Sequence, residues 1–320
     1  MSHLVEDANL DAENAADALR AARLCKADLV TSAVIEFTSV QGVMGSYYAL
    51  ASGENAQVAQ AIEQHYQPRF AGDNLPETTV GQLVALADKL DTVCGLFAID
   101  QGPTGSSDPF SVRRSAIGII NMLMAGLPIS LDAAIACALK SFDFVDFDSE
   151  AVLAAVKDFF ITRTKVILKD NGASPDAIDA VLACGVSEPA IIASRVQALE
   201  TIRNQMPETM DNLATAFARA NNLRDEAVGV AVNADLFIDA ESALDHAIEA
   251  ANQHVEEALS QGNYEAALQA LADLRDPIDT FFEEVMIMDE DEAKRTNRLA
   301  LLNRFVAVFA HIADFSALSK

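Results

Sequence analysis

The chain has 320 residues, of which 51% are hydrophobic and 6% aromatic, with 14 glycines and 9 prolines. Its apolar content is built largely on Ala and Leu, which favours helices over sheet, so we predict an all-α fold. The formal net charge of −26 repels nucleic acid over long distances. DNA binding is therefore not expected, and any RNA contact must come from local basic patches.

The sequence indicates neither a targeting segment nor a pairing of its cysteines. The cysteines Cys25, Cys94, Cys137 and Cys184 are far apart, with no C-x-x-C pair, so neither a zinc site nor a disulfide framework is indicated. The N-terminus lacks a basic region followed by an apolar run, and no apolar stretch approaches the ~20 residues that span a bilayer. We expect a soluble cytoplasmic protein with no membrane partner.

The first hundred residues predict a series of helices. An Ala-rich helix is expected over 11–37, short elements around Gly42, Gly45 and Gly53, and a further helix from about Gln57. The next helix carries an apolar stripe at three- and four-residue steps, formed by Leu83, Leu86, Leu90, Val93 and Phe97. That spacing places Asp88 and Asp91 one turn apart near the edge of the stripe.

A Gly- and Ser-rich loop follows, and Asp108-Pro109 predicts the N-cap and first position of another helix. Arg113 and Arg114 lie in its first turns. Free backbone N–H groups and two guanidinium groups beside such a loop are typical of a phosphate site. The alternative is that this arginine pair binds protein carboxylates, which are abundant here.

The remainder predicts short connections between helices, as in a bundle. Helix starts are indicated at Ser174-Pro175, Ser187-Glu188-Pro189 and Asp276-Pro277, and the acidic turn 289–292 suits the start of the final helix. Arg295 and Arg298 share one face of that helix, where pairing with the acidic turn and contact with RNA are both open.

Catalytic motifs are not found. None of the five histidines precedes an Asp, and G-x-S-x-G, Walker and H-E-x-x-H patterns do not occur. We predict no catalytic residue and no metal ligand. His65 is expected to be a hydrogen-bonded, partly buried ring rather than a ligand.

Several segments together resemble one family, the β subunit of bacterial heterotetrameric glycyl-tRNA synthetase. They include Lys26-Ala27-Asp28-Leu29, Gln41-Gly42-Val43-Met44-Gly45, Pro68-Arg69, Ala87-Asp88-Lys89-Leu90-Asp91-Thr92, Asp108-Pro109-Phe110, Arg113-Arg114, Phe281-Phe282, Asn297-Arg298-Leu299 and Ala313-Asp314-Phe315-Ser316. Because the matches run in order along nearly the whole chain, they are more specific than any single motif.

The resemblance implies a domain plan. Family members are about twice as long, so this chain is expected to be a C-terminal half, lacking the N-terminal part of β. It implies a degenerate HD-type helical domain over 1–148, a helical connector over 149–205 and an anticodon-binding helical bundle over 206–320. His65, Asp88 and Asp91 would then be remnants of an HD metal site, and without a His-Asp pair metal hydrolysis is not implied.

The resemblance also implies a function, namely recognition of glycine tRNA within an ATP-dependent glycine–tRNA ligase. Adenylation, with ATP and Mg²⁺, would occur on a separate α subunit, and the fragment alone would not be catalytic. The candidate tRNA contacts are Arg219, Asn222, Arg295 and Arg298 for the anticodon arm and Arg113 and Arg114 for backbone phosphate nearer the acceptor end. The alternatives are an HD-type metal phosphohydrolase and a purely structural scaffold for subunit assembly.

Overall fold

The computed structural model describes residues 1–70 and 72–318. This part of the chain is built from α- and 3-10 helices, with no strand apart from one isolated bridge between Thr104 and Ser107. The predicted all-α fold is confirmed. The chain forms two compact units, which we call unit 1 (Met1–Ile167 with Ser187–Ala190) and unit 2 (Leu168–Val186 with Ile191–Lys320). The three-part division at 148/149 and 205/206 stays a prediction.

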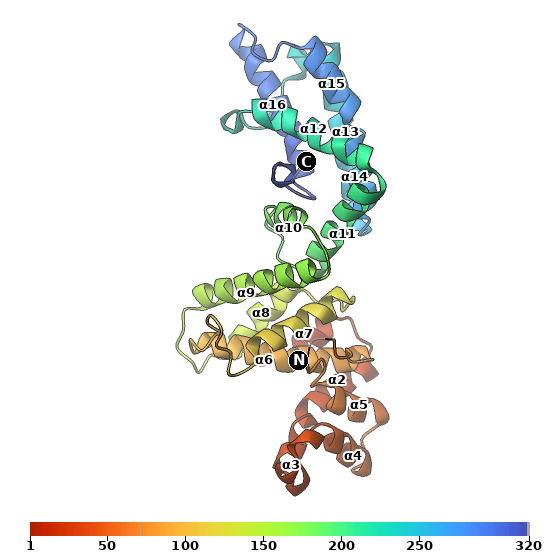
Figure 1. The fold of residues 1–320 in the computed structure, drawn as a ribbon, viewed down its shortest axis with the longest axis vertical. Coiled ribbons are helices and arrows are strands. Elements are labelled where there is room, and N and C mark those ends of the chain that lie inside the picture. The colour runs from red at the N-terminus through yellow and green to blue at the C-terminus, as the bar shows by residue number, and fades with distance from the viewer. Residues whose placement is uncertain (71, 319–320) are drawn as a thin grey trace. The chain divides into compact units, whose positions relative to one another are not determined.

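Unit 1 is a set of helices packed around one long helix, α6 (Figure 1). Its elements are α1 (Ser2–Asp7), α2 (Ala12–Leu24), η1 (Ala27–Val30), α3 (Ser32–Glu36), η2 (Thr38–Val40), α4 (Val43–Ala51), α5 (Ala56–Gln64), α6 (Thr79–Ala98), α7 (Val112–Met124), α8 (Leu131–Lys140) and the first part of α9 (Ser149–Asp170). Within those described residues, no helix is long and apolar enough to cross a membrane, and the same holds for unit 2.

Helix α6 supplies side chains to two hydrophobic clusters. Val80 and Val84 pack with α2 and α5, whereas Leu86 and Val93 belong to the larger cluster formed with α7, α8 and the start of α9. A helix that is apolar on two sides is buried between neighbours. Polar residues of α6 consequently stand at fixed places between packed helices.

The prediction of one helix over 11–37 is wrong beyond Leu24. The helix ends at Leu24 and is followed by η1 and by α3, whose N-cap is Thr31. The physical cause is Asp28, whose carboxylate accepts hydrogen bonds from the main-chain N–H groups of Gly42 (2.7 Å) and Gly45 (3.1 Å). Asp28 is 2% exposed, and both bonds reach its Oδ2, so they stabilise a buried charge that a continuous helix would leave without these donors.

The start of α7 also differs from the prediction. The helix begins at Val112, and its N-cap is Ser111, with φ of 58° and no side-chain cap hydrogen bond. Asp108 still serves the helix start, since its carboxylate accepts from the N–H groups of Val112 (2.8 Å) and Arg113 (3.0 Å). The Asp108-Pro109 pair therefore stabilises the first turn from outside the helix.

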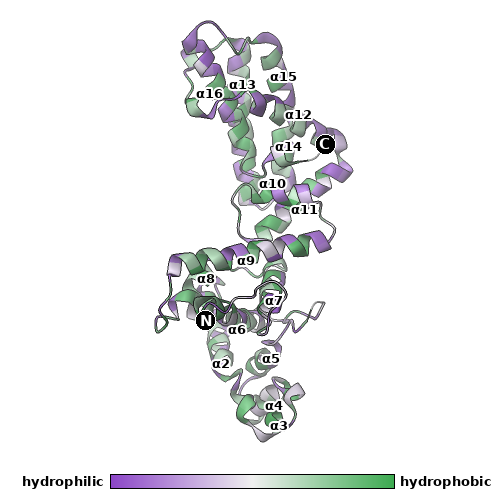
Figure 2. Cartoon of the chain, turned by 60° about the vertical axis from the view of Figure 1, so that its left-hand side comes forward, coloured by the Kyte–Doolittle hydropathy of each residue, from purple (hydrophilic) through white to green (hydrophobic). Residues whose placement is uncertain are grey.

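Unit 2 is a helical bundle. It contains the end of α9, α10 (Pro175–Leu182), α11 (Pro189–Gln205) from Ile191 on, α12 (Pro207–Leu223), η3 (Glu226–Val228), η4 (Ala234–Leu236), α13 (Asp239–Ser260), α14 (Tyr264–Ala272), α15 (Arg275–Glu284), α16 (Glu292–Phe309) and η5 (Phe315–Ala317). The rings of Phe217, Phe309 and Phe315 pack together where α12, α16 and η5 meet, with centroids 5.2–5.8 Å apart. Figure 2 shows hydrophobic and hydrophilic residues mixed along these helices, as expected where each buries one face.

Three of the predicted helix starts are confirmed in this half of the chain. Helices α10 and α11 begin at Pro175 and Pro189, and Asp291 caps α16 by accepting from the N–H groups of Ala293 and Lys294. Helix α15 begins at Arg275, two residues before the proline of the predicted Asp276-Pro277 start.

Candidate functional site

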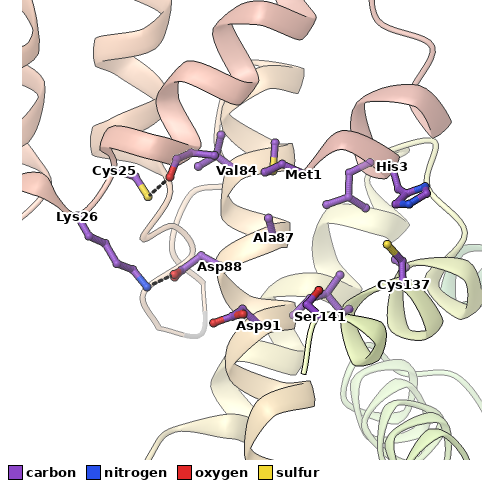
Figure 3. A pocket seen from close by; sticks show the side chains of 15 residues that line it. Met1, His3, Cys25, Lys26, Val84, Ala87, Asp88, Asp91, Cys137 and Ser141 are labelled. Atoms are coloured by element: carbon purple, nitrogen blue, oxygen red, sulfur yellow. Dashed lines mark hydrogen bonds and ion pairs between the residues drawn. The ribbon is translucent and has the colours of Figure 1, made fainter. Parts of the chain in front are cut away.

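Asp88 and Asp91 line a cavity of about 320 Å³ inside unit 1. Figure 3 shows their side chains on the same helix, with Lys26 and Cys25 from the end of α2 on one side and Cys137 and Ser141 on the other. The expected placement of the two carboxylates, one turn apart on α6, is what the structure shows.

The Asp88 carboxylate forms an ion pair with the Lys26 ammonium group. Lys26 is half exposed and Asp88 mostly buried, so the lysine reaches in from the cavity rim. A carboxylate paired with an ammonium group already has the positive charge that a metal ion would otherwise supply.

His65 lies at the end of α5 and is fully buried. Its Nδ1 is 2.6 Å from the carbonyl oxygen of Ile62, and its Nε2 is buried without a hydrogen-bond partner. Burial lowers the pKa of the ring, so His65 is neutral at pH 7. The hydrogen bond expected from the sequence is confirmed, but the ring is fully rather than partly buried.

The structure gives no metal-ligand set at these HD-type positions. Within residues 1–70 and 72–318, no group of three or more His, Cys, Asp or Glu side chains is arranged to hold a metal ion. His65 bonds to main chain and Asp88 bonds to Lys26. The resemblance of this unit to HD proteins stays a prediction.

Arg113 and Arg114 have different surroundings at the start of α7. The Arg113 guanidinium donates to the carbonyl oxygens of Gly105 (2.6 Å) and Ser107 (3.3 Å), so it holds the preceding loop. Arg114 is exposed, and its guanidinium has no ion pair or hydrogen bond to any residue that the structure describes. Arg114 is thus the member of the pair that is available to a ligand.

Arg219 and Asn222 lie near the C-terminal end of α12. The Arg219 guanidinium is 2.5 Å from the Asp279 carboxylate and lies over the Phe282 ring, 4.5 Å from its centroid. Its side chain is 42% exposed. Asn222 is exposed one turn further along. A guanidinium stacked on an aromatic ring, with a free amide beside it, is a surface suited to unstacked bases.

Arg295 and Arg298 are both engaged with the acidic turn. Arg298 donates to the Asp289 carboxylate (2.7 Å), to the Met286 carbonyl oxygen (2.8 Å) and to the Glu241 carboxylate of α13 (2.7 Å). Arg298 is 5% and Glu241 1% exposed. Arg295 donates to the Asp289 carbonyl oxygen at 2.9 Å. The sequence left open whether Arg295 and Arg298 pair with the acidic turn or contact RNA, and these contacts agree with pairing to the turn. Because Arg298 is almost fully buried, it has little surface available for RNA.

Lys89, next to His65 in unit 1, is a buried polar residue that was not predicted from the sequence. It is 6% exposed, and its ammonium group donates to the His65 carbonyl oxygen at 3.1 Å. Burial lowers its pKa to about 8. A signal was present, because Lys89 occupies a position within the apolar stripe of α6, between Leu86 and Val93 at helical spacing.

Two parts of the chain match models of known protein families. Residues 213–315 match the DALR anticodon binding domain, so this stretch of unit 2 is a helical module of that class. Residues 1–183 match the family of the glycyl-tRNA synthetase beta subunit, and the chain belongs to this family.

Individual relatives agree with that assignment. The chain is 44% identical to the glycine–tRNA ligase beta subunit of Desulforamulus reducens over 319 residues, covering 98% of this chain and 46% of the relative. It is 42% identical to that of Methylobacillus flagellatus, covering 100% and 45%, and 44% identical to that of Geobacter metallireducens, covering 94% and 44%. The chain thus spans about half the length of the curated relatives it matches.

Proposed function

We propose that this chain is a tRNA-recognising part of a glycine–tRNA ligase, in which unit 2 binds the anticodon arm. The match of residues 213–315 to an anticodon binding domain carries the proposal. The exposed end of α12 supports it, because Arg219 is held in place by Asp279 and Phe282 while Asn222 is free to donate and accept hydrogen bonds.

The proposed division of roles differs from the one expected from the sequence alone. Arg219 and Asn222 contact splayed anticodon bases, and Arg295 lies close enough to the surface to contact backbone. Arg298 holds α16 to α13. In unit 1, Arg114 is the phosphate contact and Arg113 orders the loop beside it. Glycine adenylation, with ATP and Mg²⁺, belongs to an α subunit in this proposal, and the remaining half of β completes the heterotetramer.

Binding of glycine tRNA to the 320-residue chain tests this proposal. We expect wild type to bind glycine tRNA more tightly than the same tRNA with its anticodon bases substituted. Asn222→Ala should reduce that preference by about two- to tenfold, the value of one or two hydrogen bonds. Arg224→Gln is the matched control, since Arg224 pairs with Glu226 just beyond α12. Equal affinity for both tRNAs, with the chain folded, would refute the anticodon assignment.

A scaffold role for part of unit 1 is favoured by one observation. The segment from η1 to α4 exposes large apolar side chains, namely Val30 (82%), Ile35 (67%), Phe37 (63%) and Tyr47 (64%). Exposed apolar clusters of this kind are typical of protein interfaces. In the proposed ligase, this face packs against another part of the assembly. Val30→Asp with Phe37→Asp should then weaken assembly with the α subunit while leaving tRNA affinity of the isolated chain unchanged.

A further inference from the structure

A second cavity in unit 1 has an unusual lining for so acidic a protein. It has a volume of about 370 Å³ and lies between η2, the segment after α5, and α7. Its lining residues are Thr38, Ser39, Gln41, Tyr66, Arg69 and Arg114. Two guanidinium groups and several hydroxyls therefore meet in one cavity, and no carboxylate is among the described residues that line it.

The guanidinium groups of the two arginines of this cavity are free of ion pairs in the described part of the chain. Neither the Arg69 nor the Arg114 guanidinium forms an ion pair or hydrogen bond with another residue in the described part of the chain. The Asp73 carboxylate accepts from the main-chain N–H groups of Arg69 (2.7 Å) and Asn74 (3.0 Å) rather than from the Arg69 guanidinium. In a chain with 48 acidic and 22 basic residues, this cavity brings together two guanidinium groups that are available to an anion.

The wall that carries Tyr66 is closely packed. Its ring packs on His65, with centroids 3.9 Å apart, and a Cβ on Gly42 would approach its Cδ2 to 2.8 Å. Gly42 has a φ of 79°, a conformation that suits glycine. The glycine thus lets η2 and α4 approach the tyrosine closely, which places Ser39 and Gln41 at the same cavity as the arginines.

We propose that this cavity is a phosphate-binding site. Arg69 and Arg114 supply planar forks that donate to phosphate oxygens, and the hydroxyls of Ser39 and Tyr66 supply further donors, which suits a tetrahedral anion with several acceptor oxygens. A third cavity, of about 290 Å³, shares Arg114 with this one, and Asp108, Ser111 and Arg113 also line it. The Asp108 carboxylate and the engagement of Arg113 with its own loop confine the proposed site to the cavity of Arg69 and Arg114. The phosphodiester of an RNA is the phosphate source that the proposed function supplies.

The inference deepens the proposed function and rests on it only for the choice of RNA as the source. The same chemistry could serve a free phosphate or a mononucleotide. The test therefore measures inorganic phosphate, AMP and a single-stranded RNA oligonucleotide without terminal phosphate, each against the 320-residue chain. Phosphorus NMR follows the small ligands, and fluorescence anisotropy follows a labelled RNA at low salt.

The test variant is Arg69→Gln with Arg114→Gln, and the matched control is Arg23→Gln with Lys140→Gln. The control residues are exposed, carry the same total charge and line none of the cavities described above. We expect the test variant to lose about tenfold or more in affinity, because charge-assisted bonds to phosphate are the strong ones, and the control to change less than about twofold.

The ligand that loses affinity identifies the source. Loss of RNA binding alone assigns the site to a phosphodiester backbone, and loss of phosphate and AMP binding assigns it to a small phosphate ester. The proposal is overturned if the folded test variant binds all three ligands as the control does. Discrimination between anticodons by the 320-residue chain is attributed to unit 2 and is unaffected by that failure, so the two proposals fail separately.

Discussion

The arginine that the sequence singled out on the last helix is a structural residue. Arg298 neutralises Glu241, a carboxylate that is 1% exposed, and also bonds the acidic turn through Asp289. Spacing along a helix places Arg295 and Arg298 on one face, but it does not tell which partner lies opposite. Glu241 is 57 residues away in sequence, so only the packing of α13 against α16 reveals the pair.

Arg298→Ala should destabilise unit 2 by about 3–5 kcal/mol, because removal of one partner leaves a buried charge without compensation. Amide hydrogen exchange of α16, with and without urea, measures the effect. Arg295→Ala is the control and should cost about 1 kcal/mol or less, since it loses one bond to a main-chain carbonyl. Equal effects of the two variants would contradict a structural role for Arg298.

The burial of Lys89 makes the stability of unit 1 depend on pH. Its pKa falls from the usual 10.5 to about 8 because it is buried. Between these values the unfolded chain holds more protons than the folded one, so the contribution of this group to stability increases as pH rises from about 8 to 10.5.

Lys89→Met should therefore stabilise unit 1 at pH 7, by up to about 3 kcal/mol, and the gain should shrink toward pH 10. The unbranched methionine can replace the alkyl chain that lies against Gly118. Unfolding free energies from amide exchange of α6 at both pH values provide the measurement, with the exposed Lys140→Met as control. A loss of stability at pH 7, or a gain independent of pH, would contradict the argument that burying the charged Lys89 ammonium group destabilises unit 1.

At the scale of elements, helix starts were predicted best where a proline follows a polar cap. Pro175 and Pro189 begin α10 and α11 because the ring fixes φ and lacks the N–H that a first turn leaves free. The same logic misplaced the start of α7. There the chain makes one further turn, and the Asp108 carboxylate reaches two N–H groups from four and five residues away.

Asp108→Ala should destabilise α7 by about 1–2 kcal/mol, since two N–H groups of its first turn lose their acceptor. Faster amide exchange at Val112 and Arg113 is the expected signature. Pro109→Ala is the informative control: because the proline precedes the helix, we expect a change within about 0.5 kcal/mol. A larger effect for the proline variant would favour the original Asp-Pro start.

At the scale of the whole molecule, the charge of −26 limits how this chain can hold RNA. Many of its cations pair with carboxylates, as Arg20, Arg203, Arg275 and Arg304 do. Binding then depends on a few unpaired groups, of which Arg114 and Arg69 are examples.

We expect the affinity for glycine tRNA to be modest and to fall with salt, with a slope of log K against log salt near −2 for about three phosphate contacts. A salt titration against glycine tRNA and a non-cognate tRNA measures it. The two slopes should agree while the affinities differ, because phosphate contacts position the RNA and base contacts specify it. Identical affinities for glycine tRNA and the non-cognate tRNA at every salt concentration would show that this chain does not recognise tRNA sequence.

Composition and periodicity determined the helical class, the apolar stripe of α6 and most helix starts, because these depend on neighbours three or four residues apart. Ordered motifs along the chain determined the family. Tertiary structure alone decided which charged side chains are free, since pairing depends on residues brought together from distant positions. Tertiary packing buried Lys89 and Arg298 and tied Arg113 to its own loop. It placed Arg114 and Arg69 at one cavity.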